Sequence, residues 1–207
     1  MFDSSEVVLV GSGGHARSVV DSILRSGKIG IAGTVSPSGE LGYASIPNLG
    51  DDDVLQELRS QGLCTAHIAI GYLGGFDPRP HLAAKLLGYG YDLISVIDPS
   101  AAIARSCNLG KGVFVGKNAV INSNSCIGDL AIINSGSIVE HDCRIGEYAH
   151  VAVGAVLCGG VSVGPSALIG ASATVLQGRS IGEGAIVGAG AIVVHDVVAG
   201  ETVVGVH

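Results

Sequence analysis

Residues 132–164 read IINSGSIVEHDCRIGEYAHVAVGAVLCGGVSVG, and an Ile, Val or Leu returns at every sixth position of this stretch. The same period extends in both directions and covers sixteen positions without a slip. It is typical of a parallel β-helix, because an α-helix would show a period near 3.6 and a flat strand a period of two. The sixteen residues are Ile103, Leu109, Val115, Ile121, Ile127, Ile133, Val139, Ile145, Val151, Leu157, Val163, Ile169, Val175, Ile181, Val187 and Val193.

Each six-residue unit predicts one short strand and one turn, and three units close a triangular coil. Residues 18 apart in sequence should then stack at about 4.8 Å, so sixteen units give roughly five coils. The branched residue should fill the interior, and the small residue four positions later should be a second inward position. Arg179 breaks this small-residue rule, either by pointing outward or by meeting a buried partner. The Gly that often follows the branched residue is expected to serve a turn with positive φ.

The first half of the chain lacks this period and alternates strand and helix patterns instead. We expect strands at 6–10, 29–35, 66–71 and 92–97 and helices at 15–26, 51–61 and 80–89. Such alternation is typical of a parallel sheet. Asp98-Pro99-Ser100 marks the change to the six-residue period. The sequence therefore predicts a small α/β, Rossmann-like domain at 1–98 followed by a β-helix domain at 99–207.

Composition narrows the classes of function. Net charge is −7, which argues against non-specific binding to nucleic acid. No run of 18 apolar residues indicates a membrane span, and the N-terminus lacks the basic region of a signal peptide. The five cysteines have no CxxC spacing, so they are interpreted as free thiols in a reducing cytosol, without a metal.

A glycine-rich turn, GSGGHA, joins the first predicted strand to the first predicted helix. Strand, glycine turn and helix together make a generic site for phosphate, because backbone N–H groups and the positive helix end face the ligand. The next strand, IAGTVSPSG, ends without the acidic residue that holds a ribose diol, so NAD is not expected. A tight turn without a ligand remains the alternative, and His15 either donates to a phosphate or sugar oxygen or only caps the helix.

His141 is expected to face outward at a corner of the β-helix, two residues after the inward Val139. Eighteen residues later comes Gly159, so the coil above His141 offers backbone without a side chain. A general base below a backbone N–H donor is what acyl transfer requires. An ordinary solvated corner residue is the alternative. His150, one residue before the inward Val151, should also face out.

Three stretches resemble one known family across nearly the whole chain. They are GSGGHARSVVDS at 11–22, DPSAAI at 98–103 and residues 132–164. The family is that of the sialic-acid O-acetyltransferases and nucleotide-amino-sugar N-acetyltransferases, which includes the bacillosamine- and perosamine-type enzymes. The resemblance implies a left-handed β-helix. It also implies transfer of acetyl from acetyl-CoA to a sugar, usually to the 4-amino group of a nucleotide-linked 4-amino-4,6-dideoxy sugar.

The resemblance also implies roles for individual residues. His141 would be the general base, Asp142 the acid that orients it, and Gly159 the oxyanion N–H donor. Asn134 and His150 would be polar residues of the active site, with His150 near the acetyl or pantetheine group. The full expected set is His141, Asp142 and Gly159 for catalysis, Gly11, Gly13, Gly14, His15 and Asn134 for the substrate, and His150, Gly159 and Ala171 for acetyl-CoA.

The sequence departs from the family at three places. The acidic strand end that often recognises uracil is TVSPSG here, which puts a UDP substrate in doubt. IGYLGGFDPRP places Tyr72 where the family has an acid. The usual closing GVPAK is replaced by Gly205-Val206-His207, so contacts to CoA there are unassigned.

We therefore expect a cytoplasmic, acetyl-CoA-dependent sugar N-acetyltransferase in which the amine attacks the thioester directly, with no metal. A homotrimer with shared sites is expected because outward β-helix residues are unusually apolar. They are Leu130, Ile132, Ala152, Val153, Val156, Leu168 and Ile186. The alternatives are a sugar O-acetyltransferase, a non-catalytic nucleotide-sugar-binding scaffold, and a γ-carbonic-anhydrase-like metal enzyme, for which His141, His150 and His195 lack 18-residue spacing.

Overall fold

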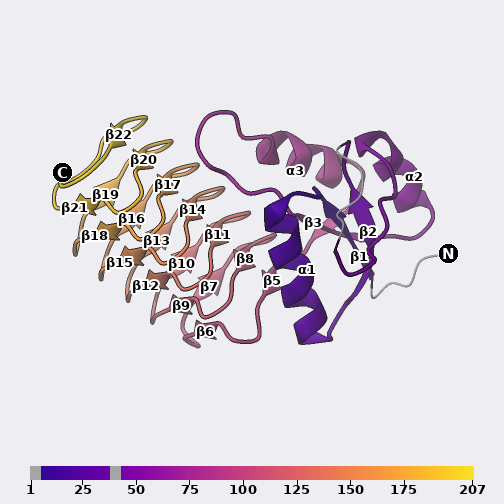
Figure 1. Cartoon of the computed structure of the whole chain (residues 1–207), viewed down its shortest axis with the longest axis horizontal. Helices are drawn as coiled ribbons and strands as arrows, with labels where there is room; N and C mark the ends of the chain where they lie inside the picture. Colours follow the sequence, from indigo (N-terminus) through magenta and orange to yellow (C-terminus); the bar gives the residue numbers. More distant parts are fainter. Residues whose placement is uncertain (1–5, 38–42) are drawn as a thin grey trace. The chain divides into compact units, whose positions relative to one another are not determined.

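A computed structural model describes residues 6–37 and 43–207 and divides the chain into two compact units. The first contains the residues up to Gly71 together with Asp77–Pro99, and the second contains Tyr72–Phe76 together with Ser100–His207 (Figure 1). The expectation about a signal peptide concerns residues 1–5, which lie outside the described ranges. Within those ranges no helix is long and apolar enough to cross a membrane.

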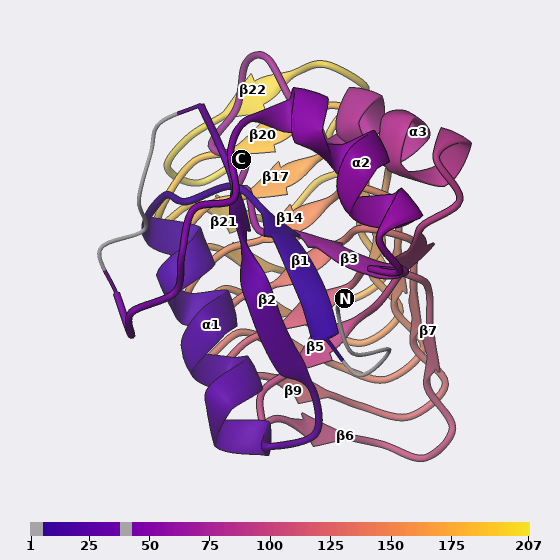
Figure 2. The same cartoon turned by 90° about the vertical axis from the view of Figure 1, so that its right-hand side faces the viewer.

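The first unit is a parallel α/β sheet, as predicted. Its four-stranded sheet has the order β2-β1-β3-β4, and Figure 2 shows α1 on one side of it and α2 and α3 on the other. The predicted fourth strand at 92–97 is in fact two two-residue strands, β4 and β5. The elements are β1 Glu6–Val10, α1 Gly14–Ser26, β2 Gly30–Val35, the 3-10 helix η1 Asp52–Val54, α2 Leu55–Ser60, β3 Thr65–Ile68, α3 Arg79–Gly88, β4 Asp92–Leu93 and β5 Val96–Ile97.

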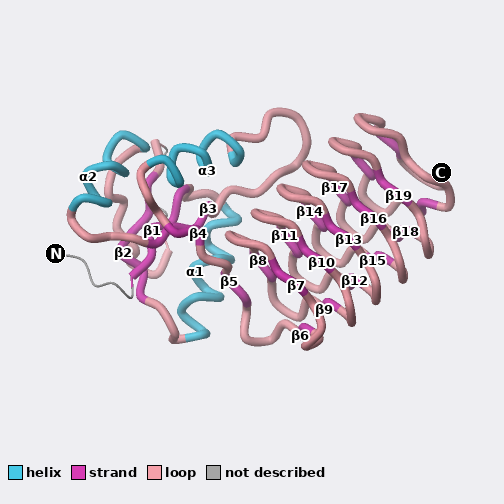
Figure 3. Tube along the Cα trace, turned by 180° about the vertical axis from the view of Figure 1, so that it is seen from behind, coloured by secondary structure: helices cyan, strands magenta, loops and turns pink. Residues whose placement is uncertain are grey.

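The second unit is a left-handed parallel β-helix of about six turns (Figure 3). Its two-residue strands form three parallel sheets. Paired strands of successive turns join residues 18 apart, such as Cys126 with Arg144, except at the last pair, β20 with β22, where Ile186 pairs with Thr202, 16 residues later. We refer to the sheets as S1, S2 and S3. S1 contains β7 Asn108–Leu109, β10 Cys126–Ile127, β13 Arg144–Ile145, β16 Ser162–Val163 and β19 Ser180–Ile181. S2 contains β8 Phe114–Val115, β11 Ile132–Ile133, β14 His150–Val151, β17 Leu168–Ile169, β20 Ile186–Val187 and β22 Thr202–Val203. S3 contains β6 Ala102–Ile103, β9 Val120–Ile121, β12 Ile138–Val139, β15 Val156–Leu157, β18 Thr174–Val175 and β21 Ile192–Val193.

The six-residue pattern fills the interior as predicted. Fourteen of the sixteen branched residues are buried in one apolar cluster, and Ile103 and Leu109 are partly buried against it. Most of the small residues four positions later belong to the same cluster, and Ser125 and Ser137 are buried beside it. Arg179, the exception, is about a third exposed, and its Nη1 lies 3.6 Å from Oδ1 of Asp196, so it points outward toward a carboxylate.

The glycines that follow the branched residues have a different function from the one predicted. Eight branched residues are followed directly by Gly, and none of these glycines has positive φ; they are at 110, 116, 128, 146, 164, 170, 182 and 188. They are required because the next turn passes too close for a side chain. An added Cβ at Gly146, for example, would lie 2.5 Å from the backbone nitrogen of Pro165. The left-handed residue lies two positions further on, and in successive units it is Gly, Asn, Asp, Ser, Tyr or Leu.

Much of the expected exposed apolar wall is buried within the single chain. Leu130, Ile132, Ala152 and Leu168 are each less than a tenth exposed. The segment Tyr72–Phe76 lies on the outer face of S2, where an added Cβ on Gly74 would come 3.1 Å from Cδ1 of Ile186. Val153 alone of the seven predicted residues is more than half exposed. These four side chains are therefore not exposed for a contact between copies of the chain.

Candidate active site

His141 lies at the corner between β12 and β13 with its side chain 56% exposed, as the spacing predicted. Its Nδ1 is 2.8 Å from Oδ2 of Asp142. Asp142 adopts a left-handed conformation, with φ of 61°, and this turn brings its carboxylate beside the ring of the preceding residue. Asp142 also accepts a hydrogen bond from Nδ2 of Asn124, one turn earlier, at 3.3 Å.

These two hydrogen bonds set the protonation of the pair. The bond to His141, and secondarily the bond to Asn124, lower the pKa of the Asp142 carboxyl. The carboxylate is therefore ionised at neutral pH and can only accept, so Nδ1 of His141 carries the proton. In the neutral imidazole Nε2 then holds the lone pair, which is the state that a general base requires.

Gly159 lies directly against this lone pair. An ideal Cβ on Gly159 would be 2.6 Å from both Cε1 and Nε2 of His141, so only glycine leaves room for the ring. The backbone on either side is tied to neighbouring turns, because Gly160 N–H donates to His141 O at 2.8 Å and Gly178 N–H donates to Gly159 O at 3.0 Å. Among the described residues no acceptor is recorded for the N–H of Gly159 itself. The corner thus combines a base with an available backbone donor.

Asn134 and His150 form a second cluster on S2. His150 points outward from the prism wall but is only 3% exposed, whereas the spacing alone suggested a surface residue. Its Nδ1 lies 2.5 Å from Tyr72 O, and its Nε2 lies 3.1 Å from Nδ2 of Asn134. Ala171 is exposed at the turn after β17 of the same sheet. Among the described residues no hydrogen bond joins this cluster to His141. Asn134 lies at the corner between S2 and S3, and His141 lies at the corner between S3 and S1, so the width of S3 separates them.

The glycine loop follows β1, in the first unit. Gly11 has a φ of 113°, and an added Cβ there would meet Cγ1 of Ile70 at 2.7 Å, so the loop needs glycine at this point. Gly13 and Gly14 are exposed at the start of α1, with open space where their side chains would be. Gly13, the N-cap, has no side chain that could cap the first N–H groups of α1. The binding of an anion at this helix start stays a prediction.

Strand order places this loop where α/β proteins bind ligands. The chain moves from β1 to β2 on one side and then to β3 on the other, so β1 is the point at which the direction of winding changes. Ligands of open α/β sheets bind at the carboxyl ends of strands at such a point. His15 is half-buried in α1, and the Cβ position of Gly71 lies 3.5 Å from its Cβ.

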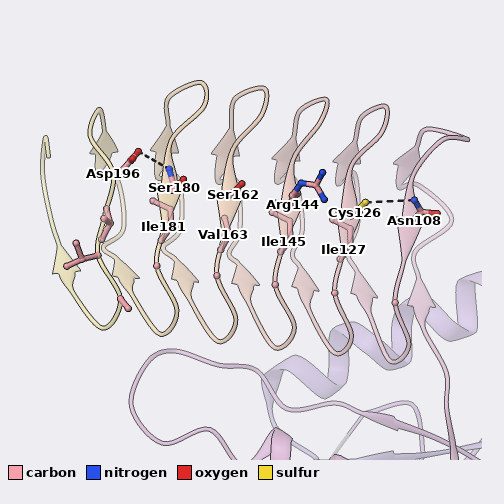
Figure 4. Close-up of a pocket in the computed structure, with 18 of the residues that line it drawn as sticks. Asn108, Cys126, Ile127, Arg144, Ile145, Ser162, Val163, Ser180, Ile181 and Asp196 are labelled. Atoms are coloured by element: carbon pink, nitrogen blue, oxygen red, sulfur yellow. Dashed lines mark hydrogen bonds between the residues drawn. The ribbon is translucent and has the colours of Figure 1, made fainter.

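A groove of about 820 Å³ runs along the outer face of S1 and contains none of the predicted site residues (Figure 4). Arg144, Cys126 and Ser162 project from its wall, with Asp196 at one end. Its glycine-rich floor follows from the close approach of successive turns. Among the described residues no group of three or more His, Cys, Asp or Glu is placed to hold a metal ion.

Two partners of the site residues were not predicted. Asn124 could have been found, because it lies 18 residues before Asp142 and therefore stacks beneath it. Tyr72 had been noted only as a departure from the family pattern, and no repeat spacing connects it to His150.

Comparisons with known proteins place this geometry in context. The family model described as the PglD N-terminal domain matches residues 6–73. A variant of GDP-perosamine N-acetyltransferase from Caulobacter crescentus, solved with CoA and GDP-perosamine, is 41% identical with a TM-score of 0.90. That match covers 97% of this chain and 93% of the other.

Two further solved structures are similar over almost their full lengths. The acetyltransferase domain of PglB from Neisseria gonorrhoeae FA1090, in complex with acetyl coenzyme A, is 27% identical with a TM-score of 0.90, covering 98% of this chain and 97% of the other. WeeI from Acinetobacter baumannii AYE is 26% identical with a TM-score of 0.82, covering 96% of each chain. A search of curated proteins found no match.

Proposed function

Because the chain belongs to the family of hexapeptide-repeat β-helix sugar acetyltransferases, we propose that it acetylates the 4-amino group of a nucleotide-linked 4-amino-4,6-dideoxy sugar. The observation that carries the proposal is the corner formed by His141, Asp142 and Gly159. It holds an imidazole oriented by Asp142, and the Cα of Gly159 lies against the same ring.

In the proposed reaction the neutral sugar amine attacks the carbonyl carbon of the acetyl thioester. Nε2 of His141 accepts the proton that the nitrogen loses, and the Asp142 carboxylate stabilises the resulting imidazolium. The N–H of Gly159 donates to the carbonyl oxygen as negative charge develops there. The C–S bond then breaks, and His141 returns the proton to the departing sulfur. No covalent intermediate with the protein is required.

We assign the nucleotide end of the substrate to the glycine loop of the 1–98 domain. Gly11 makes the tight turn, and Gly13 and Gly14 leave the first N–H groups of α1 open, which suits a diphosphate. His15 would donate to a phosphate or sugar oxygen, and Asn134 would contribute from the 99–207 domain. GDP-linked sugars are the first to test, because the relative that is 41% identical was solved with GDP-perosamine.

We further propose a cytoplasmic homotrimer in which acetyl-CoA lies between two copies. Gly159 and Ala171, both expected to contact acetyl-CoA, lie on opposite sides of S3, so one chain does not bring them together. The outer residues of S3 are mainly β-branched and partly exposed, with Ile192 at 42%. A neighbouring copy packed on this face would bury it and could bring the second corner to the first.

Two experiments test the proposal. Acetyl-CoA turnover would be measured with 4-amino sugars linked to UDP, GDP and dTDP, and with sialic acid to detect the O-acetyltransferase alternative. His141→Ala should lower kcat by roughly 10²–10⁴ with the fold intact. If the protein bound a nucleotide sugar tightly but turned over none of the substrates, the result would support the alternative of a non-catalytic scaffold that binds nucleotide sugars. Near-wild-type kcat in the variant would overturn the role of His141.

The trimer has its own test. Light scattering at the enzyme concentration of the assay should give three times the 20.6 kDa mass of one chain. A fully active monomer would overturn both the trimer and the shared site.

A further inference from the structure

His150 is a buried polar residue in an apolar row. Its register partners on S2 are Ile132 and Leu168, both buried, and its own side chain is 3% exposed. A polar group in such surroundings is stable only when its hydrogen-bonding atoms have partners. Both ring nitrogens have them: Nδ1 lies 2.5 Å from Tyr72 O, and Nε2 lies 3.1 Å from Nδ2 of Asn134.

The partners determine which nitrogen carries the proton. Oδ1 of Asn134 accepts from the backbone N–H of Ser135 at 2.8 Å, so the other end of the amide, Nδ2, faces His150 as a donor. Nε2 of His150 must therefore accept. A carbonyl oxygen can only accept, so Nδ1 carries the hydrogen and donates it to Tyr72 O.

The segment that His150 holds is Tyr72–Phe76, which groups with the β-helix although it lies far from it in sequence. Gly74 and Gly75 both have positive φ, at 92° and 81°. Leu73 and Phe76 are 87% and 88% exposed, so their side chains contribute little to holding the segment in place. The hydrogen bond between Nδ1 of His150 and Tyr72 O attaches the start of this segment to S2.

We infer that His150 is a positioning residue: the hydrogen bond from its Nδ1 to Tyr72 O fixes the Tyr72–Phe76 segment, and Asn134 fixes the tautomer that makes this bond. His150 then acts on the reaction through the segment. The segment continues the chain directly from Gly71. The ideal Cβ position of Gly71 lies 3.5 Å from Cβ of His15, and His15 belongs to the proposed nucleotide-sugar site. The inference rests on the proposed function in this respect.

Two substitutions separate this role from direct contact with substrate. In His150→Asn the side-chain amide nitrogen can take the place of Nδ1 and still donate to Tyr72 O. In His150→Gln the amide can replace Nε2 and keep the contact with Asn134, while the bond to Tyr72 is lost. We expect His150→Gln to raise KM for the nucleotide sugar about two- to tenfold, the effect of one hydrogen bond, with kcat changed less. His150→Asn should raise KM less than His150→Gln does, and the exposed control His195→Gln should remain near wild type.

Contrary results would overturn the inference. It fails if His150→Asn is impaired as much as His150→Gln, if both lower kcat about 10²-fold as loss of an acid or base would, or if neither changes KM.

Measurements without substrate keep the inference testable whether or not the proposed activity is found. In wild-type protein with ¹⁵N-labelled histidine, NMR should show His150 protonated at Nδ1 and not at Nε2. The opposite tautomer, or a protonated ring at pH 7, would refute the inference without any variant. Hydrogen exchange at residues 73–76 should be faster in His150→Gln than in His150→Asn. Equal rates in the two variants would also refute it.

Discussion

Gly159→Ala is the most direct test of the His141 corner, because it adds one methyl group and removes nothing. The new Cβ would lie 2.6 Å from both Cε1 and Nε2 of His141. Non-bonded carbon atoms are stable at about 3.5–4.0 Å, so the imidazole must retreat by about 1 Å or more. The φ of Gly159 is not in the left-handed region, so alanine fits the backbone and the perturbation falls on the ring.

The expected effect is kinetic rather than structural. A displacement of about 1 Å in a catalytic group can cost about 10²-fold in rate, so kcat should fall by about that factor. Because the His141 side chain is 56% exposed, the ring can swing toward solvent, and the free energy of unfolding should change by no more than about 0.5 kcal/mol. The N–H of residue 159 is retained in the variant.

The assay is steady-state acetyl transfer with both substrates saturating, together with thermal unfolding. Gly88→Ala is the matched control, because the Cβ position of Gly88 meets no atom within 4 Å. Introducing Gly159→Ala into a His141→Ala background should cause little further loss, since both changes act on the same group. Wild-type kcat in Gly159→Ala would refute the reasoning. An equal loss with and without His141 would show that residue 159 acts by another route.

Three further predictions concern other parts of the chain. Asn124→Ala removes one of the hydrogen bonds that lower the pKa of Asp142, so an NMR titration should show this pKa rising toward the usual carboxyl value. An unchanged pKa would contradict the contribution of Asn124 and leave the hydrogen bond to His141 as the cause of the lowered pKa. Burial lowers the pKa of His67 to about 4, from its usual value of 6.5. Between pH 6.5 and about 4 the His67 imidazole therefore binds a proton in the unfolded chain but not in the folded chain. The free energy of unfolding should decrease by up to about 3 kcal/mol as the pH falls from 6.5 to about 4. In His67→Asn the free energy of unfolding, measured by denaturant titration at pH 7 and 4.5, should differ less between the two pH values than in the wild type. An equal difference in the two proteins would contradict this explanation. Gly146→Ala should destabilise the β-helix by about 1–3 kcal/mol, because its Cβ would lie 2.5 Å from a backbone nitrogen of the next turn; an unchanged unfolding midpoint would contradict the close approach of turns.

The arrangement of the His141 corner was predictable because the β-helix makes register a local property. With 18 residues in each turn, the position of Gly159 above His141 follows from counting, and the structure places the ring directly against that glycine. The same count places Asn124 below Asp142. The role of the glycines after the branched residues was mispredicted, because a period shows where glycine is needed but not whether φ or a neighbouring backbone requires it.

The sequence by itself therefore determined the β-helix, the parallel α/β unit and the outward position of His141, since each depends on periodicity or on neighbours along the chain. Only the tertiary structure decided which outward residues are covered. His150 and Tyr72 are 78 residues apart, and their hydrogen bond forms because a segment from outside the repeat lies on S2. No period encodes such a contact. It depends on how a connecting segment closes against a surface already formed, and this burial turns a predicted surface histidine into a buried hydrogen-bond donor.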